Sequence, residues 1–120
     1  MILLAFLTTT CEPCRQFWEM LADPGARAAL DVGVAVVTPS PAMEDERLAG
    51  QLTPPGVHLH MGSETWFAYG VLQAGTFVLV RDAPGGEPPF GHQGEVIGRA
   101  TPAGPTELLD LLNRWLGRSS

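Results

Sequence analysis

Five short runs of apolar and β-branched residues alternate along the chain with segments whose apolar positions recur at helical spacing. Two of the runs, residues 2–7 and 32–38, are apolar at nearly every position, which is typical of strands buried on both faces of a sheet. The expected strands cover residues 2–7, 32–38, 57–61, 76–81 and 95–99.

Four segments between and after these runs predict helices. Pro13 suits a first helical turn because its missing N–H needs no partner there, and Asp23-Pro24-Gly25 is expected to end that helix. Ser40 and Ser63 are expected to cap two further helices, the latter ending at Gly70. The expected helices cover residues 13–22, 40–52, 63–69 and 106–116.

This order of elements predicts an α/β fold. Alternation of strands with helices favours parallel pairing with right-handed crossovers, whereas the last two strands have no helix between them and are expected to pair antiparallel. We therefore expect a central mixed five-stranded sheet with helices on both faces. The 120 residues, 45% hydrophobic and 17% charged, are typical of a single globular domain over residues 1–120.

The distribution of charged and apolar residues argues against a nucleic-acid partner and against a membrane-spanning segment. Thirteen acidic and seven basic residues give a net charge of −6 without a basic stripe, so we expect no nucleic-acid partner. No apolar run reaches 18 residues, so no membrane-spanning segment is expected. The opening MILLAFL is interpreted as a strand rather than a signal peptide.

Cys11 and Cys14 are the only cysteines in the chain, and they stand where the first strand gives way to the first helix. The unpaired N–H groups and the dipole at a helix start are expected to favour a thiolate at Cys11. Cys14 follows one turn later, where side chains three positions apart are neighbours, so a small adjustment closes a disulfide. The pair predicts a redox switch that needs no cofactor beyond the Cys11–Cys14 disulfide itself.

Three neighbouring residues are expected to adjust the redox properties of this cysteine pair. Pro13 stiffens the turn between the cysteines, and the negative charge of Glu12 opposes the helix dipole beside Cys11. Thr10, directly before Cys11, is assigned to the same group. A less stabilised thiolate favours a reductant or exchanger over a strong oxidant.

Three other interpretations of the cysteines stay open. His58 and His60 would complete a Cys₂His₂ zinc set, but their spacing matches no compact zinc motif, and no metal site is expected. A permanent bracing disulfide would close a loop too small to add much stability. A thiol peroxidase agrees with Thr8, three residues before Cys11, but Leu4 stands where such a site would carry proline.

The strand–CEPC–helix start, followed by a β-α-β unit, resembles the thioredoxin superfamily and within it the TlpA-type thiol-disulfide oxidoreductases. Residues 69–82, YGVLQAGTFVLVRD, are similar to the family pattern Y-G-V-x-x-x-P-T-x-x-x-x-D, and residues 94–100 and 106–116 resemble its last strand and helix. The resemblance implies a thioredoxin-like fold in which Cys11 attacks a disulfide and Cys14 resolves the mixed disulfide. It also implies that the segment Ala74, Gly75, Thr76 offers backbone groups to a bound peptide strand.

The same resemblance implies the partners and the location. The expected partners are a disulfide-bearing protein substrate and an upstream thiol reductant. TlpA-type relatives work outside the cytoplasm on a membrane tether, so the expected location is extracytoplasmic, with membrane contact only through a tether absent from this chain. The other expectation is a cytoplasmic location.

Two positions depart from the family pattern. Gly75 stands where the family carries a cis-proline, and we expect a trans Ala74–Gly75 bond because a cis bond without proline is costly. The positions of the family's buried acid hold Ala5 and Phe17, so resolution of the mixed disulfide is expected to be slow or to use water or Glu12. These departures support an alternative function, a thioredoxin-fold binding or assembly module with weakened redox activity.

The expected strand directions also predict where two connections lie. The connection 82–94, with His92, is expected at the end of the sheet opposite Cys11, and residues 100–104 are expected at the Cys11 end. Trp66 and Phe67 are expected to pack in the core rather than to form a docking surface.

Overall fold

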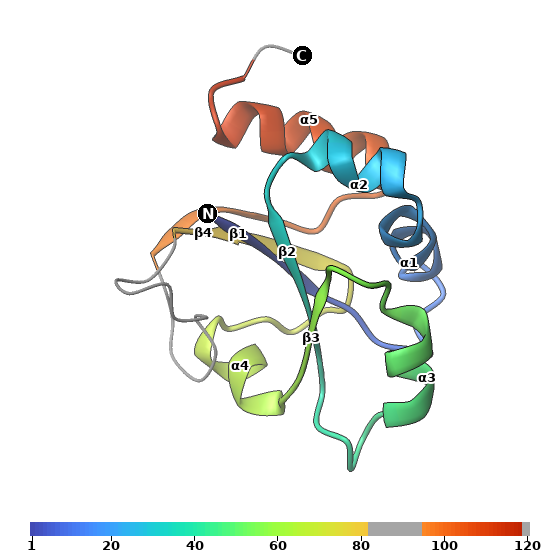
Figure 1. Cartoon of the computed structure of the whole chain (residues 1–120). Coiled ribbons are helices and arrows are strands. Elements are labelled where there is room, and N and C mark those ends of the chain that lie inside the picture. Colours follow the sequence, from blue (N-terminus) through green and yellow to red (C-terminus); the bar gives the residue numbers. More distant parts are fainter. Residues whose placement is uncertain (82–94, 119–120) are drawn as a thin grey trace.

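The structure, a computed structural model, describes residues 1–81 and 95–118 (Figure 1). The strands in these ranges are β1 (Ile2–Phe6), β2 (Gly33–Thr38), β3 (His58–Met61), β4 (Thr76–Val80) and β5 (Val96–Ala100). The helices are α1 (Arg15–Ala22), α2 (Pro24–Leu30), α3 (Glu46–Leu52), α4 (Ser63–Ala68) and α5 (Pro105–Trp115).

The strands form one mixed sheet in the order β3-β2-β1-β4-β5. β2 pairs in parallel with both β1 and β3, whereas β4 pairs antiparallel with both β1 and β5. The predicted α/β class with a five-stranded mixed sheet is confirmed, as is the antiparallel pairing of the last two strands.

The expectation of parallel pairing after every helix is wrong for β4. The connection that contains α4 begins and ends at one end of the sheet: the N–H of Gly62 donates to the carbonyl of Thr38 at 3.0 Å, and that of Gly75 donates to the carbonyl of Phe6 at 2.7 Å. Because Thr38 and Phe6 both close their strands, β4 starts where β1 finishes and runs back along it.

The central strand β1 separates two apolar clusters. Leu3 and Ala5 point into the larger one, which is built from α1, α2 and α5, while Leu4 and Phe6 point into a smaller one under α4. Figure 1 shows α1, α2 and α5 on one side of the sheet and α4 on the other, which confirms the expectation of helices on both faces. Trp66 belongs to the smaller cluster and meets Phe6 edge to face with ring centroids 5.3 Å apart, so its predicted core position is confirmed.

Two helix boundaries differ from the prediction. Asp23-Pro24-Gly25 ends α1 but also begins α2, which the sequence analysis missed. The carboxylate of Asp23 accepts the N–H of Gly25 at 3.0 Å, and Pro24 occupies the first turn. The next helix begins at Glu46, with Asp45 accepting the N–H of Leu48 at 3.1 Å, so Ser40 is not its cap.

Ser63 and Phe67 also differ from expectation. Gly62 occupies the cap position of α4, and the hydroxyl of Ser63 instead accepts the N–H of Ser40 at 3.0 Å, which joins two connections at this end of the sheet. Phe67 is 82% exposed, so its predicted core position is wrong.

The connection 82–94, including His92, lies outside the described residues. Among the helices of the described ranges, none combines the length and the apolar character needed to cross a membrane.

Gly98 of β5 yields a prediction about stability. A Cβ at this position would lie 2.2 Å from the indole of Trp115, which packs on the larger cluster. We expect Gly98→Ala to lower the free energy of unfolding by about 1–3 kcal/mol, because the indole has to move off the sheet. Urea unfolding followed by circular dichroism measures this change.

Gly50 provides the matched control. It lies inside α3, and a Cβ there would meet nothing within 4 Å. Gly50→Ala is therefore expected to raise stability by about 0.5–1 kcal/mol through the helix propensity of alanine. Equal effects of the two substitutions would contradict the close packing of Trp115 on Gly98.

Candidate functional site

The two cysteines share a tight turn between β1 and α1. The N–H of Cys14 donates to the carbonyl oxygen of Cys11 at 3.2 Å, and it also points at the Sγ of Cys11 at 3.2 Å. The helix begins at Arg15, two residues after the predicted start, so Cys14 occupies its cap position and Cys11 lies one turn earlier. Both side chains are free thiols.

The two thiols differ in their access to solvent. Cys11 is partly exposed, whereas Cys14 is completely buried in the larger apolar cluster. Only Cys11 can therefore meet a sulfur on another molecule, while Cys14 can reach the Sγ of Cys11, with which it shares a side-chain hydrogen bond. The family resemblance implies the same division, with Cys11 attacking and Cys14 resolving, and these roles stay a prediction.

The surroundings of Cys14 favour the protonated form of its thiol. Burial raises the pKa of Cys14 to about 12, and the hydrogen bond with Cys11 and the nearby charge of Glu44 act in the same direction. A backbone hydrogen bond from Thr8 opposes these effects. At neutral pH Cys14 is a neutral thiol, so it must lose its proton before it can attack a disulfide.

Glu44 brings a carboxylate to this site. It lies in the connection between β2 and α3, and its side chain accepts hydrogen bonds from both the backbone N–H and the hydroxyl of Thr9. Thr9 is the neighbour of Thr8, which hydrogen-bonds Cys14. The fold thus supplies an acid near the cysteines from an element other than the two that the family resemblance indicated.

Glu44 lies outside the positions at which the family resemblance places an acid, so its role was not predicted from the sequence. Those positions hold Ala5 and Phe17, which are buried in the core. One clue was present: Glu44 follows the second apolar strand, and the carboxyl ends of adjacent parallel strands meet at one end of a sheet.

The predicted tuning residues surround Cys11 at the surface. Thr10, Glu12 and Pro13 are all exposed. Among the described residues, no hydrogen bond or ion pair joins the side chain of Glu12 to either cysteine. Their influence on the cysteines stays a prediction.

The predicted peptide-binding segment lies at the same end of the sheet. The Ala74–Gly75 bond is trans, as predicted, and Gly75 adopts a φ of 91°, which residues with a side chain rarely reach. The N–H of Gly75 is bonded to Phe6, and the hydroxyl of Thr76 donates to the carbonyl of Gln73 at 2.7 Å. Within the described residues, the backbone groups of Ala74 are left without an internal partner.

The connection before α5 also reaches this end of the sheet, as predicted. The side-chain amide of Gln16, in the first turn of α1, donates to the carbonyl of Ala103 at 2.7 Å. Residues 101–104 therefore stand beside the helix that follows the cysteines.

A hollow of about 360 Å³ opens next to Cys11. It lies between α1 and α3 and is lined by Thr9, Thr10, Cys11, Glu12, Arg15, Trp18, Glu19, Ala22, Gln51 and Leu52. Its volume is at the lower end of the range of ligand-binding pockets.

The histidines stand apart from the cysteines. His60 faces Glu64 with 3.5 Å between Nε2 and Oε1, and His58 is exposed. Within residues 1–81 and 95–118, no group of three or more His, Cys, Asp or Glu side chains is arranged to hold a metal ion.

Comparison with known proteins assigns neither a family nor a function to the chain. The chain matches no family model, and no curated protein matches it.

Proposed function

We propose that this chain is a thiol-disulfide oxidoreductase with a thioredoxin-like fold, which reduces or exchanges disulfides in a protein substrate. One observation carries the proposal: a partly exposed Cys11 and a buried Cys14 share one turn, with the N–H of Cys14 directed at the Sγ of Cys11 at 3.2 Å. The mixed sheet, with this turn at the carboxyl end of its central strand, supports the same assignment.

In the first step, the thiolate of Cys11 attacks one sulfur of the substrate disulfide. The Cys11–substrate bond forms, the substrate disulfide breaks, and the other substrate sulfur leaves as a thiolate. In the free protein, the backbone N–H of Cys14 is directed at this sulfur at 3.2 Å.

In the second step, Cys14 loses its proton and attacks the Sγ of Cys11. The Cys11–Cys14 disulfide forms, the mixed disulfide breaks, and the second substrate sulfur leaves as a thiolate. Because the pKa of Cys14 is raised to about 12, this step needs a proton acceptor at neutral pH. We assign that role to Glu44, whose carboxylate is anchored on Thr9 and acts on Cys14 by charge; within the described ranges no hydrogen bond joins the two side chains, so the proton passes between them through water.

The two steps transfer two electrons from the cysteine pair to the substrate. The oxidised pair then needs an external dithiol that returns the electrons, and the chemistry calls for no cofactor other than the Cys11–Cys14 disulfide. An upstream thiol reductant and a membrane tether stay predictions of the family resemblance.

The substrate backbone is expected to lie along the segment Ala74–Thr76. The free backbone groups of Ala74 suit a short β-type contact with an extended peptide. The N–H of Gly75 is already bonded to Phe6 and takes no part in that contact.

A second candidate function is a binding or assembly module with weakened redox activity. The observation in its favour is the glycine at position 75, whose trans bond and positive φ differ from the family's cis-proline. This candidate predicts that the chain holds a partner without turning over its disulfide.

The first functional prediction separates these candidates by cysteine substitution. We expect Cys11→Ser to abolish the reduction of insulin disulfides, because the attacking thiol is lost. Cys14→Ala keeps an apolar side chain in the buried position and is expected to accumulate a mixed disulfide at Cys11, detected by the intact mass. If wild-type protein reduces insulin no faster than Cys11→Ser, the binding module is the better description.

The second functional prediction concerns Glu44. A chromogenic thionitrobenzoate attached to Cys11 is released when Cys14 attacks, so its absorbance reports the second step directly. We expect Glu44→Gln to slow this release about 100-fold at pH 7, because the proton acceptor is lost. The difference in release rate between Glu44→Gln and wild-type protein should shrink as the pH rises towards the pKa of Cys14, about 12, because hydroxide then removes the proton.

The opposite sign would overturn the role of Glu44. If its carboxylate acts only as a charge, Glu44→Gln lowers the pKa of Cys14 and speeds the release at neutral pH. Glu12→Gln tests the acceptor suggested by the sequence, and Glu46→Gln, an exposed acid in the first turn of α3, serves as the unaffected control.

A further inference from the structure

The hollow beside Cys11, named here the Trp18 pocket, has an apolar floor. Trp18 is 5% exposed, and its indole N–H donates to the carbonyl of Thr8 at 3.1 Å, so the ring is held in one orientation. Leu52, half-buried at the end of α3, and the exposed Ala22 of α1 are the other apolar side chains that line the hollow. Trp18 and Leu52 also pack on the larger core cluster, so the floor is formed before any ligand arrives.

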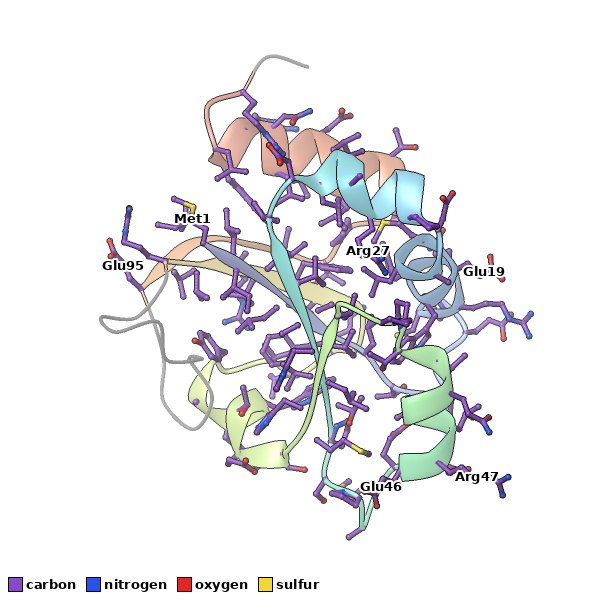
Figure 2. The ribbon with its side chains drawn as sticks, in the orientation of Figure 1. Met1, Glu19, Arg27, Glu46, Arg47 and Glu95 are labelled. Carbon is purple, nitrogen blue, oxygen red and sulfur yellow. The ribbon has the colours of Figure 1, made fainter. Side chains whose placement is uncertain are left out.

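The rim of the Trp18 pocket carries charges that have no partner in the fold. Glu12, Arg15 and Glu19 line it, all three are exposed, and Figure 2 shows Glu19 projecting outward from α1. Among the described residues, none of their side chains forms an ion pair or a hydrogen bond. Two carboxylates against one guanidinium leave the rim acidic, and the whole chain carries −6.

The position of Cys11 links this pocket to the reaction. Cys11 itself lines the hollow, and a disulfide bond is only about 2 Å long, so a substrate sulfur bonded to Cys11 lies at the pocket's edge. The residue next to the substrate cysteine is then within reach of the floor. A volume of about 360 Å³ suits one large side chain rather than a folded domain.

We propose that the Trp18 pocket selects the substrate: it takes a large apolar side chain adjacent to the reacting cysteine, in a polypeptide segment that also carries Lys or Arg. The apolar side chain packs on Leu52, Ala22 and the exposed edge of the Trp18 indole, and the basic group lies near Glu12 and Glu19. This inference rests on the proposed function, because the substrate cysteine is placed by its bond to Cys11.

The binding test uses peptides that cannot react. Two short peptides carry serine in place of the cysteine, one with Lys-Leu before it and one with Glu-Gly. Addition of the Lys-Leu peptide is expected to shift the indole N–H resonance of Trp18 in a nitrogen-15 NMR spectrum. The indole resonances of Trp66 and Trp115, which lie outside the pocket, serve as internal controls. Equal shifts of Trp18 with both peptides, or no shift with either, would overturn the proposal.

The exchange test uses charge reversal with the corresponding cysteine disulfide peptides. Glu19→Lys is expected to lower kcat/KM for the Lys-Leu peptide relative to the Glu-Gly peptide about fivefold, the effect of roughly 1 kcal/mol at an exposed site. Glu46 lies on α3 (Figure 2) and does not line the pocket, so Glu46→Lys is expected to leave that ratio unchanged. An equal change of the ratio in both variants means that net charge, not the pocket, sets the preference.

The two proposals fail in different ways. If small disulfides are reduced but the peptides show no preference, the Trp18 pocket is not a selecting site and the oxidoreductase proposal stands. If no disulfide is reduced while the serine peptide still binds at Trp18, the pocket is a binding site and the redox function is rejected.

Discussion

The hydrogen bond from the N–H of Cys14 to the sulfur of Cys11 depends on where β1 ends. That strand is buried on both faces, so its carboxyl end is fixed in space and the following turn has little freedom. The N–H of Leu7 donates to Val37 at 3.1 Å, and the indole of Trp18 ties α1 back to Thr8. The geometry of the thiol pair is therefore set by the core packing beneath it.

This position also makes the two thiols unequal in their access to solvent. The larger cluster encloses Cys14 and leaves Cys11 at the surface, so in the proposed mechanism Cys11 attacks the substrate and Cys14 resolves the mixed disulfide. The same burial raises the pKa of Cys14, which makes proton removal part of the proposed mechanism. In that mechanism the acceptor is Glu44 from a neighbouring connection, and its hydrogen bonds with Thr9 hold it at the end of β1.

Three connections meet around the cysteines because the strand directions bring them to one end of the sheet. The segment before β4 is tied to Phe6, the segment before α5 is tied to Gln16, and the segment before α3 carries Glu44. The Trp18 pocket lies on the α3 side of Cys11. In the proposed mechanism, a substrate strand runs from Ala74 past Cys11 towards this pocket.

Apolar periodicity and turn residues act over a few neighbouring positions, so they were enough to predict the five strands, most helices and the cysteine pair. They did not determine the direction of β4, the start of α2 as a separate helix, or the exposure of Phe67. The contact of Glu44 with Thr9 joins residues 35 positions apart, and only the parallel pairing of β1 with β2 brings them together. Such contacts depend on the order and direction of strands, which the packing of the whole chain decides.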